Sequence, residues 1–433
     1  MIEYFNTDSF EIDKLRIQFL ELSKKYRVFS ILDSNNWQFD SHKSYDLLAA
    51  FGSVNNTSSD KSVNSFDALK KEHATHKDWI FTYLSYDIKN ELEDLHSNNL
   101  DSIQAPNIQY FIPKLLFLIK DNQLKVLVNE NFVEDKNVIS DIEKALSNPI
   151  EKEEIKVKAI EVKHRISREE YLEAISKIRN HIKQGDIYEL NYCQEFYSEN
   201  TEIEPSLVFK KLISKSPTPF SAFVRFNDIF ILSASPERFI KKEGTKILSQ
   251  PIKGTSRRHA DALLDMTSKK DLANNDKERA ENIMIVDLVR NDLSHTAKKG
   301  SVHVDELCKI YSFKQVHQMI STISSELAEK YDFIDVLKTT FPMGSMTGAP
   351  KIRAMQLIEL YEQTKRGIYS GAIGYITPEG DFDFNVVIRS LIYNQKNKYL
   401  SFIAGGAITY QSDPEKEYAE SLLKAEAIRE ILS

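Results

Sequence analysis

Two pairs of glutamates are the residues of this chain whose spacing most directly suggests chemistry. Glu278 and Glu281 lie in a helical run that begins at Asp276, and Glu417 and Glu420 lie near the C-terminus. Residues three apart are neighbours on one helix face, so each pair would place two carboxylates side by side. Such like charges repel, and a shared cation would relieve the repulsion. Because magnesium prefers carboxylate oxygens, the two pairs indicate a candidate magnesium site.

The same spacing also arises by chance on solvated helices, in a chain that carries 64 acidic residues. A di-iron carboxylate centre would instead need Glu-x-x-His on two helices. No histidine stands three residues after any of these glutamates. Spacing alone therefore leaves a magnesium site and an ordinary solvated face open, and it excludes the di-iron alternative.

Three glycine-rich segments are the next candidates for ligand binding, and they lie at residues 251–255, 341–351 and 404–409. Each could present backbone N–H groups to a carboxylate or a phosphate. None fits the Gly-x-x-x-x-Gly-Lys-Ser/Thr phosphate loop or the Gly-x-Gly-x-x-Gly dinucleotide motif. Taken singly, each segment is equally well an ordinary tight turn.

The composition excludes several classes of function. The formal net charge is −7 and the two signs are mixed along the chain, so there is no basic footprint for nucleic acid. No stretch approaches the ~20 apolar residues that cross a bilayer, and the N-terminus does not resemble a signal peptide. Two cysteines are too few for a disulfide framework. We therefore expect a cytoplasmic protein that binds neither nucleic acid nor membranes.

Local patterns predict the elements that must position these residues. Ser167 and Glu170 form a capping box, and Gly185 ends the apolar period that follows, which predicts a helix over about 170–184. The strand-like runs are 187–197, 220–226 and 230–234, followed by a hairpin over 238–250 and a helix over 414–432. Because these strands follow one another without helical crossovers, we expect an α+β fold with helices packed on broad antiparallel sheets.

A change of composition near residue 155 suggests two parts. Residues 1–155 are rich in Asn, Ser and Asp, and a polar tract from Asn55 to Asn64 predicts an exposed loop. The charged run at 151–158 fits a solvated linker or an edge strand. We therefore expect an N-terminal subdomain over 1–155 and a catalytic region over 156–433.

Several segments taken together, and in order, resemble the chorismate-utilising enzymes. The resemblance runs from about residue 165 to the C-terminus and is carried by 185–191, 233–239, 251–255, 344–351 and 405–409, together with the two Glu-x-x-Glu helices. This family includes anthranilate, aminodeoxychorismate, isochorismate and salicylate synthases, all built as helices around two large antiparallel sheets. The resemblance therefore implies that fold and chorismate as the substrate.

The resemblance also implies roles for the four glutamates. Magnesium would be held by Glu281 and Glu420, and Glu278 and Glu417 would orient metal-bound waters. A cation bridged to a ring carboxylate of chorismate would act as a Lewis acid where the hydroxyl departs.

Two further residues align with the reacting centre of the family. Glu237 would be the general acid that protonates the leaving hydroxyl, and burial near Phe239 would raise its pKa in the required direction. His317 aligns with an active-site histidine near the ring, although a lone histidine amid apolar residues is more often structural.

Substrate contacts implied by the resemblance come from six residues: Thr255, Lys351, Tyr375, Arg389, Gly405 and Gly406. Tyr375 and Arg389 would bind the enolpyruvyl carboxylate, Arg389 through a charge-assisted fork. Gly405 and Gly406 would offer backbone N–H groups to the same carboxylate.

Glu189 and Lys253 discriminate within the family. Members that use water carry a lysine at the position of Glu189, which disfavours isochorismate and salicylate synthesis. Members that use ammonia usually have glutamine there, and a carboxylate could orient ammonia or take a proton from ammonium.

Lys253 stands where many aminodeoxychorismate synthases have a lysine that adds to the ring, and where anthranilate synthases generally have alanine. A nucleophilic lysine must be neutral, so desolvation or a nearby positive charge should lower its pKa. The alternative is a surface lysine in a turn.

These features imply amination of chorismate to 4-amino-4-deoxychorismate, on the route to 4-aminobenzoate and folate. The alternatives are anthranilate synthesis and, from another class, a catalytically silent chorismate binder. Neither Cys193 nor Cys308 lies in the Gly-x-Cys-x-Gly elbow of a glutaminase, so ammonia should come from solution or from a separate glutaminase subunit. Met343 and Ala407 replace family glycines, so the backbone approach there should differ.

Overall fold

The computed structural model describes residues 2–7, 10–37, 40–54, 57–58, 64–130, 159–314 and 316–433. The charged run at 151–158 and the boundary expected near residue 155 lie outside these residues, as does most of the loop expected at 55–64. The division into two parts therefore stays a prediction.

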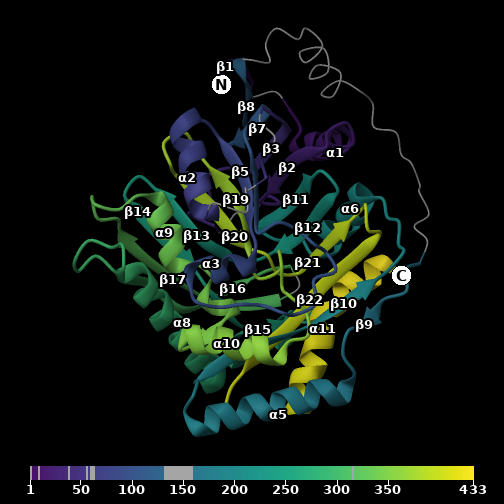
Figure 1. Ribbon diagram of the computed structural model, residues 1–433, viewed down its shortest axis with the longest axis vertical. Coiled ribbons are helices and arrows are strands. Elements are labelled where there is room, and N and C mark those ends of the chain that lie inside the picture. The colour runs from purple at the N-terminus through teal and green to yellow at the C-terminus, as the bar shows by residue number, and fades with distance from the viewer. Residues whose placement is uncertain are drawn as a thin grey trace.

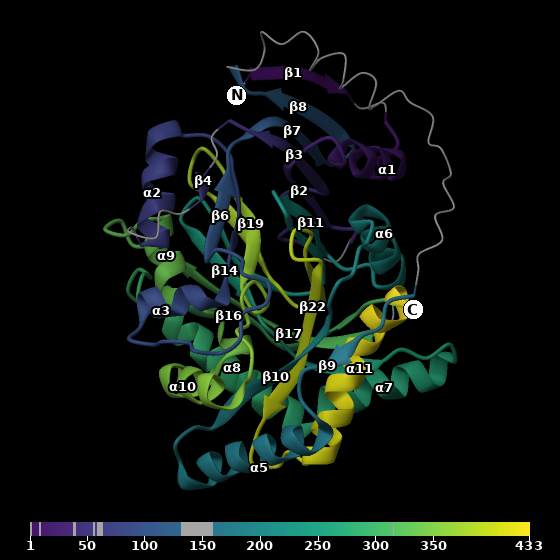
Figure 2. The same ribbon diagram turned by 45° about the vertical axis from the view of Figure 1, so that its right-hand side comes forward.

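Helices surround two sheets along the described chain (Figure 1). The helices are α1 (Ile12–Ser23), α2 (Ser65–His76), α3 (Lys89–Leu92), α5 (Arg168–Gln184), α6 (Pro205–Lys215), α7 (Ala262–Asn274), α8 (Asp276–Ser294), α9 (Phe333–Thr340), α10 (Lys351–Tyr361) and α11 (Pro414–Leu432). Figure 2 shows α5, α8, α10 and α11 gathered at the end of the molecule opposite β1 (Ile2–Thr7), and Figure 1 agrees.

The larger sheet has twelve strands, in the order β1-β8-β7-β3-β2-β11-β12-β21-β22-β10-β18, with β9 paired to β10. Its other strands are β2 (Val28–Asp33), β3 (Leu47–Ser53), β7 (Pro113–Lys120), β8 (Gln123–Val128), β9 (Lys163–His164), β10 (Glu189–Ser198), β11 (Phe220–Phe226), β12 (Ile229–Ser235), β18 (Gly348–Ala349), β21 (Ser390–Asn394) and β22 (Tyr399–Ile408).

The second sheet has ten strands, in the order β15-β17-β14-β13-β20-β19-β5-β6-β4, with β16 paired to β17. These strands are β4 (Thr57–Ser58), β5 (Ile80–Leu84), β6 (Ile108–Phe111), β13 (Arg238–Glu243), β14 (Lys246–Gln250), β15 (Ile252–Arg257), β16 (His303–Ser312), β17 (Val316–Glu326), β19 (Ala372–Ile376) and β20 (Phe382–Val386). Both sheets are antiparallel, so the expected α+β class is confirmed.

The chain packs in four layers, helix, sheet, sheet and helix, and strand β3 shows why. Leu47, Ala49 and Phe51 face a core shared with α1, α6 and α11, whereas Leu48 and Ala50 face the core between the two sheets. Strand side chains alternate between faces, so a strand buried on both sides is apolar at successive positions. The outer face of the ten-stranded sheet packs against α2, α8 and α9.

N-terminal strands enter both sheets beside strands of the later chain. Strand β2 pairs with β11, and β5 pairs with β19, each in an antiparallel register. The segments on either side of residues 131–158 therefore share their sheets and their cores.

The local patterns of the sequence set the ends of the helices that carry or support the site. The Ser167 hydroxyl accepts from the Glu170 N–H, the Glu170 carboxylate accepts from the Ser167 N–H, and Gly185 adopts a left-handed φ of 83°, which confirms the expected helix α5. Asp413 caps α11 by accepting from two backbone N–H groups, so this helix starts at Pro414 as expected. This start places Glu417 in the first turn of α11.

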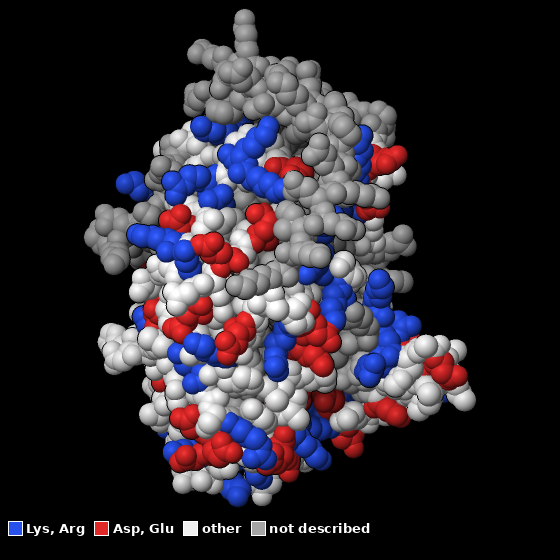
Figure 3. All heavy atoms as spheres, turned by 90° about the vertical axis from the view of Figure 1, so that its right-hand side faces the viewer, with Lys and Arg blue, Asp and Glu red and all other residues white. Residues whose placement is uncertain are grey.

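Charges of both signs are interspersed over the described residues on the face shown in Figure 3. Within the described residues, no helix is both long enough and apolar enough to cross a membrane.

A buried ion pair ties strand β10 to the loops beside it. The Arg366 guanidinium is 1% exposed and donates to both carboxylate oxygens of Glu362, at 2.9 and 2.7 Å. It also donates to the carbonyl oxygens of Met346 at 2.6 Å and Asn191 at 2.7 Å. Glu362 in turn accepts from the Cys193 N–H at 2.9 Å. This network holds the segment around Met346 against β10.

We expect Arg366→Met to lower the free energy of unfolding by about 3–5 kcal/mol, because it leaves the Glu362 charge buried without its partner. Denaturant unfolding followed by circular dichroism would measure the loss. The double variant Arg366→Met with Glu362→Met should recover part of it, since neither charge remains. A single variant as stable as the wild type would contradict this account.

Candidate active site

Residues from both sheets and two helices meet at the end of the molecule where α8 and α11 lie (Figure 1). Glu189 begins β10, Lys253 lies on β15, and Glu237 immediately precedes β13. Helix α8 packs on β15 and carries one glutamate pair, and α11 packs on β22 and carries the other.

Lys253 and Glu189 form a buried ion pair. The Lys253 Nζ lies 2.7 Å from Glu189 Oε1, and the two side chains are 10% and 1% exposed. Burial lowers the pKa of Lys253, but the carboxylates of Glu189 and Glu281 raise it by more than burial lowers it. The net pKa of Lys253 therefore lies above its ordinary value. The expected lowering of this pKa is therefore wrong, because Lys253 faces carboxylates and not a second cation. The other oxygen, Glu189 Oε2, is buried and accepts no hydrogen bond from a described residue.

Asn282 fixes the backbone of Lys253. Its side chain is buried on α8, and Nδ2 donates to the carbonyl oxygens of Lys253 and Met319, each at 3.3 Å. Sequence reasoning missed this residue, although an asparagine inside the apolar period of a helix signals a buried polar contact. Gly254 adopts a φ of 95°, and a Cβ there would lie 3.1 Å from Glu278 Oε2, so glycine permits the close approach of α8.

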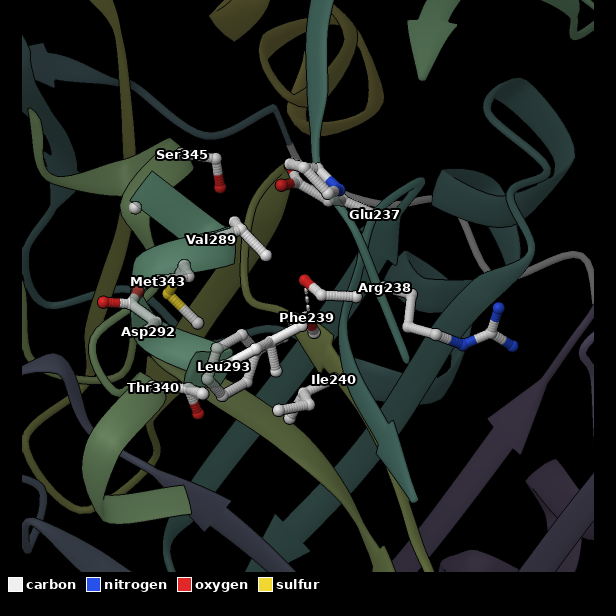
Figure 4. A pocket seen from close by; sticks show the side chains of 13 residues that line it. Glu237, Arg238, Phe239, Ile240, Val289, Asp292, Leu293, Thr340, Met343 and Ser345 are labelled. Atoms are coloured by element: carbon white, nitrogen blue, oxygen red, sulfur yellow. Dashed lines mark hydrogen bonds between the residues drawn. The ribbon is translucent and has the colours of Figure 1, made fainter. Parts of the chain in front are cut away.

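Glu237 has the environment of a proton donor at neutral pH. Its side chain is buried, and burial raises its pKa to about 7, although Ser345 and the Lys253 charge act in the opposite direction. The expected rise in this pKa is confirmed. Glu237 lines a cavity of about 330 Å³ together with Phe239, Met343, Gly344 and Ser345 (Figure 4). Lys253 does not line this cavity, so the cavity covers only the Glu237 side of the site.

The neighbouring Arg238 anchors the strand that carries Glu237. Its guanidinium is fully buried and points away from the cavity in Figure 4. It donates to both oxygens of Asp383, at 2.9 and 3.1 Å, and to both oxygens of Asp40, at 3.1 and 2.7 Å. Because neighbouring residues of an extended strand point to opposite sides, this clamp fixes the direction of the Glu237 side chain.

The two glutamate pairs converge on one ammonium group. The Lys277 Nζ lies 3.7 Å from Glu281 Oε1 on its own helix and 3.7 Å from Glu417 Oε1 on α11. Burial raises the pKa of Glu281 to about 7 and raises that of Glu278, whereas Lys424 lowers the pKa of Glu420.

These carboxylates fit a cation, although they do not form a finished metal centre. In the described part of the chain, no three Asp, Glu, His or Cys side chains already lie together in an arrangement that could hold a metal ion. The fit rests on Glu281 Oε1, which is buried and accepts no hydrogen bond from any residue that the structure describes. It rests also on Gly406, where a Cβ would lie 3.6 Å from both Glu417 Oε2 and Glu420 Oε1, so that glycine leaves space beside the two carboxylates.

Among the expected substrate contacts, Arg389 has the clearest place. Its guanidinium lies near enough to Glu237 to affect the pKa of both groups, and no described residue accepts a hydrogen bond from it. Burial lowers its pKa, and the nearby Glu237 carboxylate acts in the opposite direction. A partly buried cation without an acceptor fits the carboxylate of a ligand.

Lys351 and His317 have partners that sequence reasoning did not foresee. The Lys351 Nζ donates to Asp292 at 2.6 Å and to the Thr340 carbonyl oxygen at 3.3 Å, so its charge is already engaged. His317 is buried, with Nδ1 2.8 Å from Ser312 Oγ and Nε2 3.1 Å from Asp265 Oδ1. Both ring nitrogens are engaged within the chain, and a role for His317 at the substrate ring stays a prediction.

Three more of the expected substrate contacts lie in three different environments. Tyr375 packs against Tyr45, Trp79 and Phe81 and lines a separate cavity of about 500 Å³. This packing does not support contact with the carboxylate of a substrate bound at Glu237. Thr255 is exposed on β15 opposite Gln318. At Gly405 a Cβ would lie 2.0 Å from the Tyr192 carbonyl oxygen, so the pairing of β22 with β10 requires glycine there.

The model of the family described as "chorismate binding enzyme" matches residues 26–430. The chain belongs to the chorismate-binding enzymes. The match spans strands of both sheets and every residue of the candidate site, including Glu189, Lys253 and Glu237. Because it starts at residue 26, it also takes in most of the N-terminal strands of this chorismate-binding chain.

Individual relatives of this chorismate-binding chain carry two names. This chain is 34% identical over 365 residues to anthranilate synthase component 1 of Aquifex aeolicus. The alignment covers 80% of this chain and 72% of the relative. It is 41% identical over 263 residues to aminodeoxychorismate synthase component 1 of Klebsiella aerogenes. That alignment covers 61% of this chain and 58% of the relative, so the chain spans little more than half of that protein.

Solved structures confirm the expected family fold. Anthranilate synthase component I from Streptococcus pneumoniae TIGR4 superposes with a TM-score of 0.73 at 28% sequence identity. The superposition covers 81% of this chain and 80% of that protein. The two chains therefore share the fold described above.

Proposed function

We propose that this chain is an aminodeoxychorismate synthase component 1, which converts chorismate and ammonia to 4-amino-4-deoxychorismate with magnesium. The observation that carries the proposal is Lys253. Its amine is buried and lies close enough to Glu189, Glu281 and Glu237 for each of them to affect its pKa. A turn lysine at the surface would meet none of these groups, whereas a nucleophile must reach both the proton donor and the substrate.

Magnesium would be held by Glu281 and Glu420, with Glu278 and Glu417 on its waters, and when bound it would supply Lewis-acid activation of the ring carboxylate. The chain's own residues supply the proton transfers. Since the pKa of Glu237 is about 7, a substantial fraction of this side chain carries a proton at neutral pH, ready for the leaving hydroxyl.

Glu189 is proposed as the group that frees the Lys253 amine. Transfer of one proton across their 2.7 Å contact gives neutral Lys253 and a protonated Glu189. The Lys253 nitrogen then bonds to the ring carbon distal to the hydroxyl, the carbon–oxygen bond breaks, and the hydroxyl leaves as water with the proton of Glu237. Ammonia attacks the carbon that lost the hydroxyl, and Lys253 leaves as a neutral amine and takes back the proton from Glu189. The new ring ammonium then gives one proton to the Glu237 carboxylate, which restores the starting state.

Arg389 and Glu189 Oε2 would bind the two reactants. The guanidinium of Arg389 has no acceptor among the described residues and lies next to Glu237, which suits the enolpyruvyl carboxylate of chorismate. The free oxygen of Glu189 is buried and would accept a hydrogen bond from the incoming ammonia. Both roles are part of the proposal.

A separate glutaminase subunit is proposed as the source of ammonia. Burial raises the pKa of the Cys193 thiol to about 11 and also raises that of Cys308, so neither is poised as the thiolate nucleophile of a glutaminase. The expected partners of this chain are thus chorismate, ammonia and the glutaminase.

The product distinguishes this function from anthranilate synthesis. Purified chain incubated with chorismate, magnesium and ammonium should give a product with the mass of aminodeoxychorismate and without the fluorescence of anthranilate. Glutamine in place of ammonium should give no product until a glutaminase subunit is added. Anthranilate as the main product would overturn the proposal, and no product with either amine would favour the silent chorismate binder.

Lys253→Ala tests the residue that carries the proposal. Without a nitrogen source, the wild type should accumulate an adduct with the mass of chorismate minus water on the peptide that contains Lys253. Lys253→Ala should form no adduct and lose aminodeoxychorismate synthesis, whereas Lys246→Ala, at an exposed position on β14, should behave like the wild type. Undiminished aminodeoxychorismate synthesis by Lys253→Ala would show that the lysine is not the nucleophile.

A further inference from the structure

Lys277 lies within ion-pair distance of one carboxylate from each glutamate pair. It precedes Glu278 on α8, and its ammonium is equally far, 3.7 Å, from a carboxylate oxygen of Glu281 and one of Glu417 on the facing helix α11. Its pKa is affected by all four carboxylates of the two pairs. The ammonium therefore occupies the place where the two helices present their negative charge to each other.

The contacts of Lys277 are loose compared with those of its neighbour Lys424. Lys424 lies 2.8 Å from Glu420 and donates to the Gly405 carbonyl oxygen at 2.8 Å. Lys277 approaches no carboxylate of a described residue closer than 3.7 Å, which is beyond hydrogen-bond distance, and its side chain is 36% exposed. Leaving this place would therefore cost Lys277 no hydrogen bond, and solvent is within its reach.

A divalent cation and this ammonium cannot share the place. Magnesium binds carboxylate oxygens at about 2.0–2.1 Å, so an ion on Glu281 would lie within a few ångström of an ammonium that remained beside the same oxygen. Two positive charges at that separation repel strongly in a partly buried site. Either the metal or the ammonium can neutralise Glu281 and Glu417 at one time.

We propose that Lys277 is a built-in counter-cation, which holds α8 and α11 together when no metal is bound and is displaced when magnesium binds. This inference rests on the magnesium part of the proposed function and does not depend on which amino product is formed. Two consequences follow. Lys277 stabilises the metal-free protein, and it weakens metal binding because the ion must first displace it.

Metal binding without substrate tests the proposal, with manganese as the probe and the free-ion electron paramagnetic resonance signal as the readout. In protein stripped with a chelator, Lys277→Met should bind manganese about tenfold more tightly than the wild type, because no ammonium competes. Lys277→Arg keeps the charge and should stay near the wild type. Lys416→Met removes an equal charge from an exposed position next to Glu417 and should change affinity little.

Thermal unfolding supplies the second readout. Without metal, Lys277→Met should unfold at a lower temperature than the wild type, and saturating manganese should remove most of the difference. A variant that folds only in the presence of manganese would support the proposal equally, since the metal would then replace the missing ammonium. Equal or weaker manganese binding by Lys277→Met would overturn it. No manganese binding by any of the proteins would overturn the magnesium site itself, which separates the two failures.

Discussion

Glu237→Gln should lower kcat/KM by about 10²–10⁴-fold, because the amide cannot hand a proton to the leaving hydroxyl. The substitution preserves the shape of the side chain in the cavity beside Phe239 and Ser345, so the loss would report chemistry and not packing. Steady-state rates with chorismate and ammonium measure it. Rates within a few-fold of the wild type would remove Glu237 from the role of general acid.

The same substitution should make the protein relatively more stable at high pH. The pKa of Glu237 in the folded chain is about 7, above the ordinary value of 4.5 for a glutamate. A carboxyl group with a raised folded pKa contributes stability that is complete below about pH 4.5 and is lost as the pH rises through about 7. Glutamine does not titrate and escapes this loss.

Unfolding curves at pH 5 and pH 8 test the sign of this linkage. Relative to the wild type, Glu237→Gln should gain free energy of unfolding between the two pH values, by at most about 3 kcal/mol. The expected combination of lower activity and higher relative stability at pH 8 would not arise from simple damage to the fold. If the stability of Glu237→Gln relative to the wild type were the same or lower at pH 8 than at pH 5, Glu237 would already be ionised well below neutral pH.

Glu281→Gln and Glu420→Gln should each reduce turnover by roughly 10³-fold or more at saturating chorismate, because each removes a charged ligand of the proposed magnesium ion. Excess magnesium should restore part of the rate if the main defect is affinity. Glu426→Gln, at an exposed position of α11, is the matched control and should leave turnover unchanged. Wild-type turnover by either ligand variant at ordinary magnesium concentrations would contradict the metal assignment.

Structural features that depend only on neighbouring residues, such as the ends of helices, were predictable from the sequence. The capping box of Ser167 and Glu170, the left-handed Gly185 and the start of α11 at Pro414 each depend on a few adjacent positions. The α+β class was also predictable, since β11 and β12, and β13 and β14, follow one another without a helix and pair antiparallel. Helix α6, which lies between β10 and β11, was missed, so the expectation that no helix separates these strands is wrong there. The pairing of β2 with β11 was not, because it joins strands that are far apart in sequence.

Contacts between residues far apart in sequence were also the part of the candidate site that could not be predicted. The raised pKa of Glu237 follows from burial, which the apolar residues around it predict. Charge partners do not follow in this way. Asp292 lies 59 residues before Lys351, and Asp265 lies 52 residues before His317, so only the folded chain shows that both side chains are already engaged.

The sheets also determine what would happen to the chain if it were divided. Strands β2 and β5 fill places beside β11 and β19, so a fragment that begins after residue 158 would leave two long rows of backbone N–H and C=O groups unpaired. Unpaired strands of this kind recruit strands from other molecules. A catalytic fragment expressed without residues 1–130 would therefore tend to aggregate, and adding the missing segment as a separate peptide would be the natural way to rescue it.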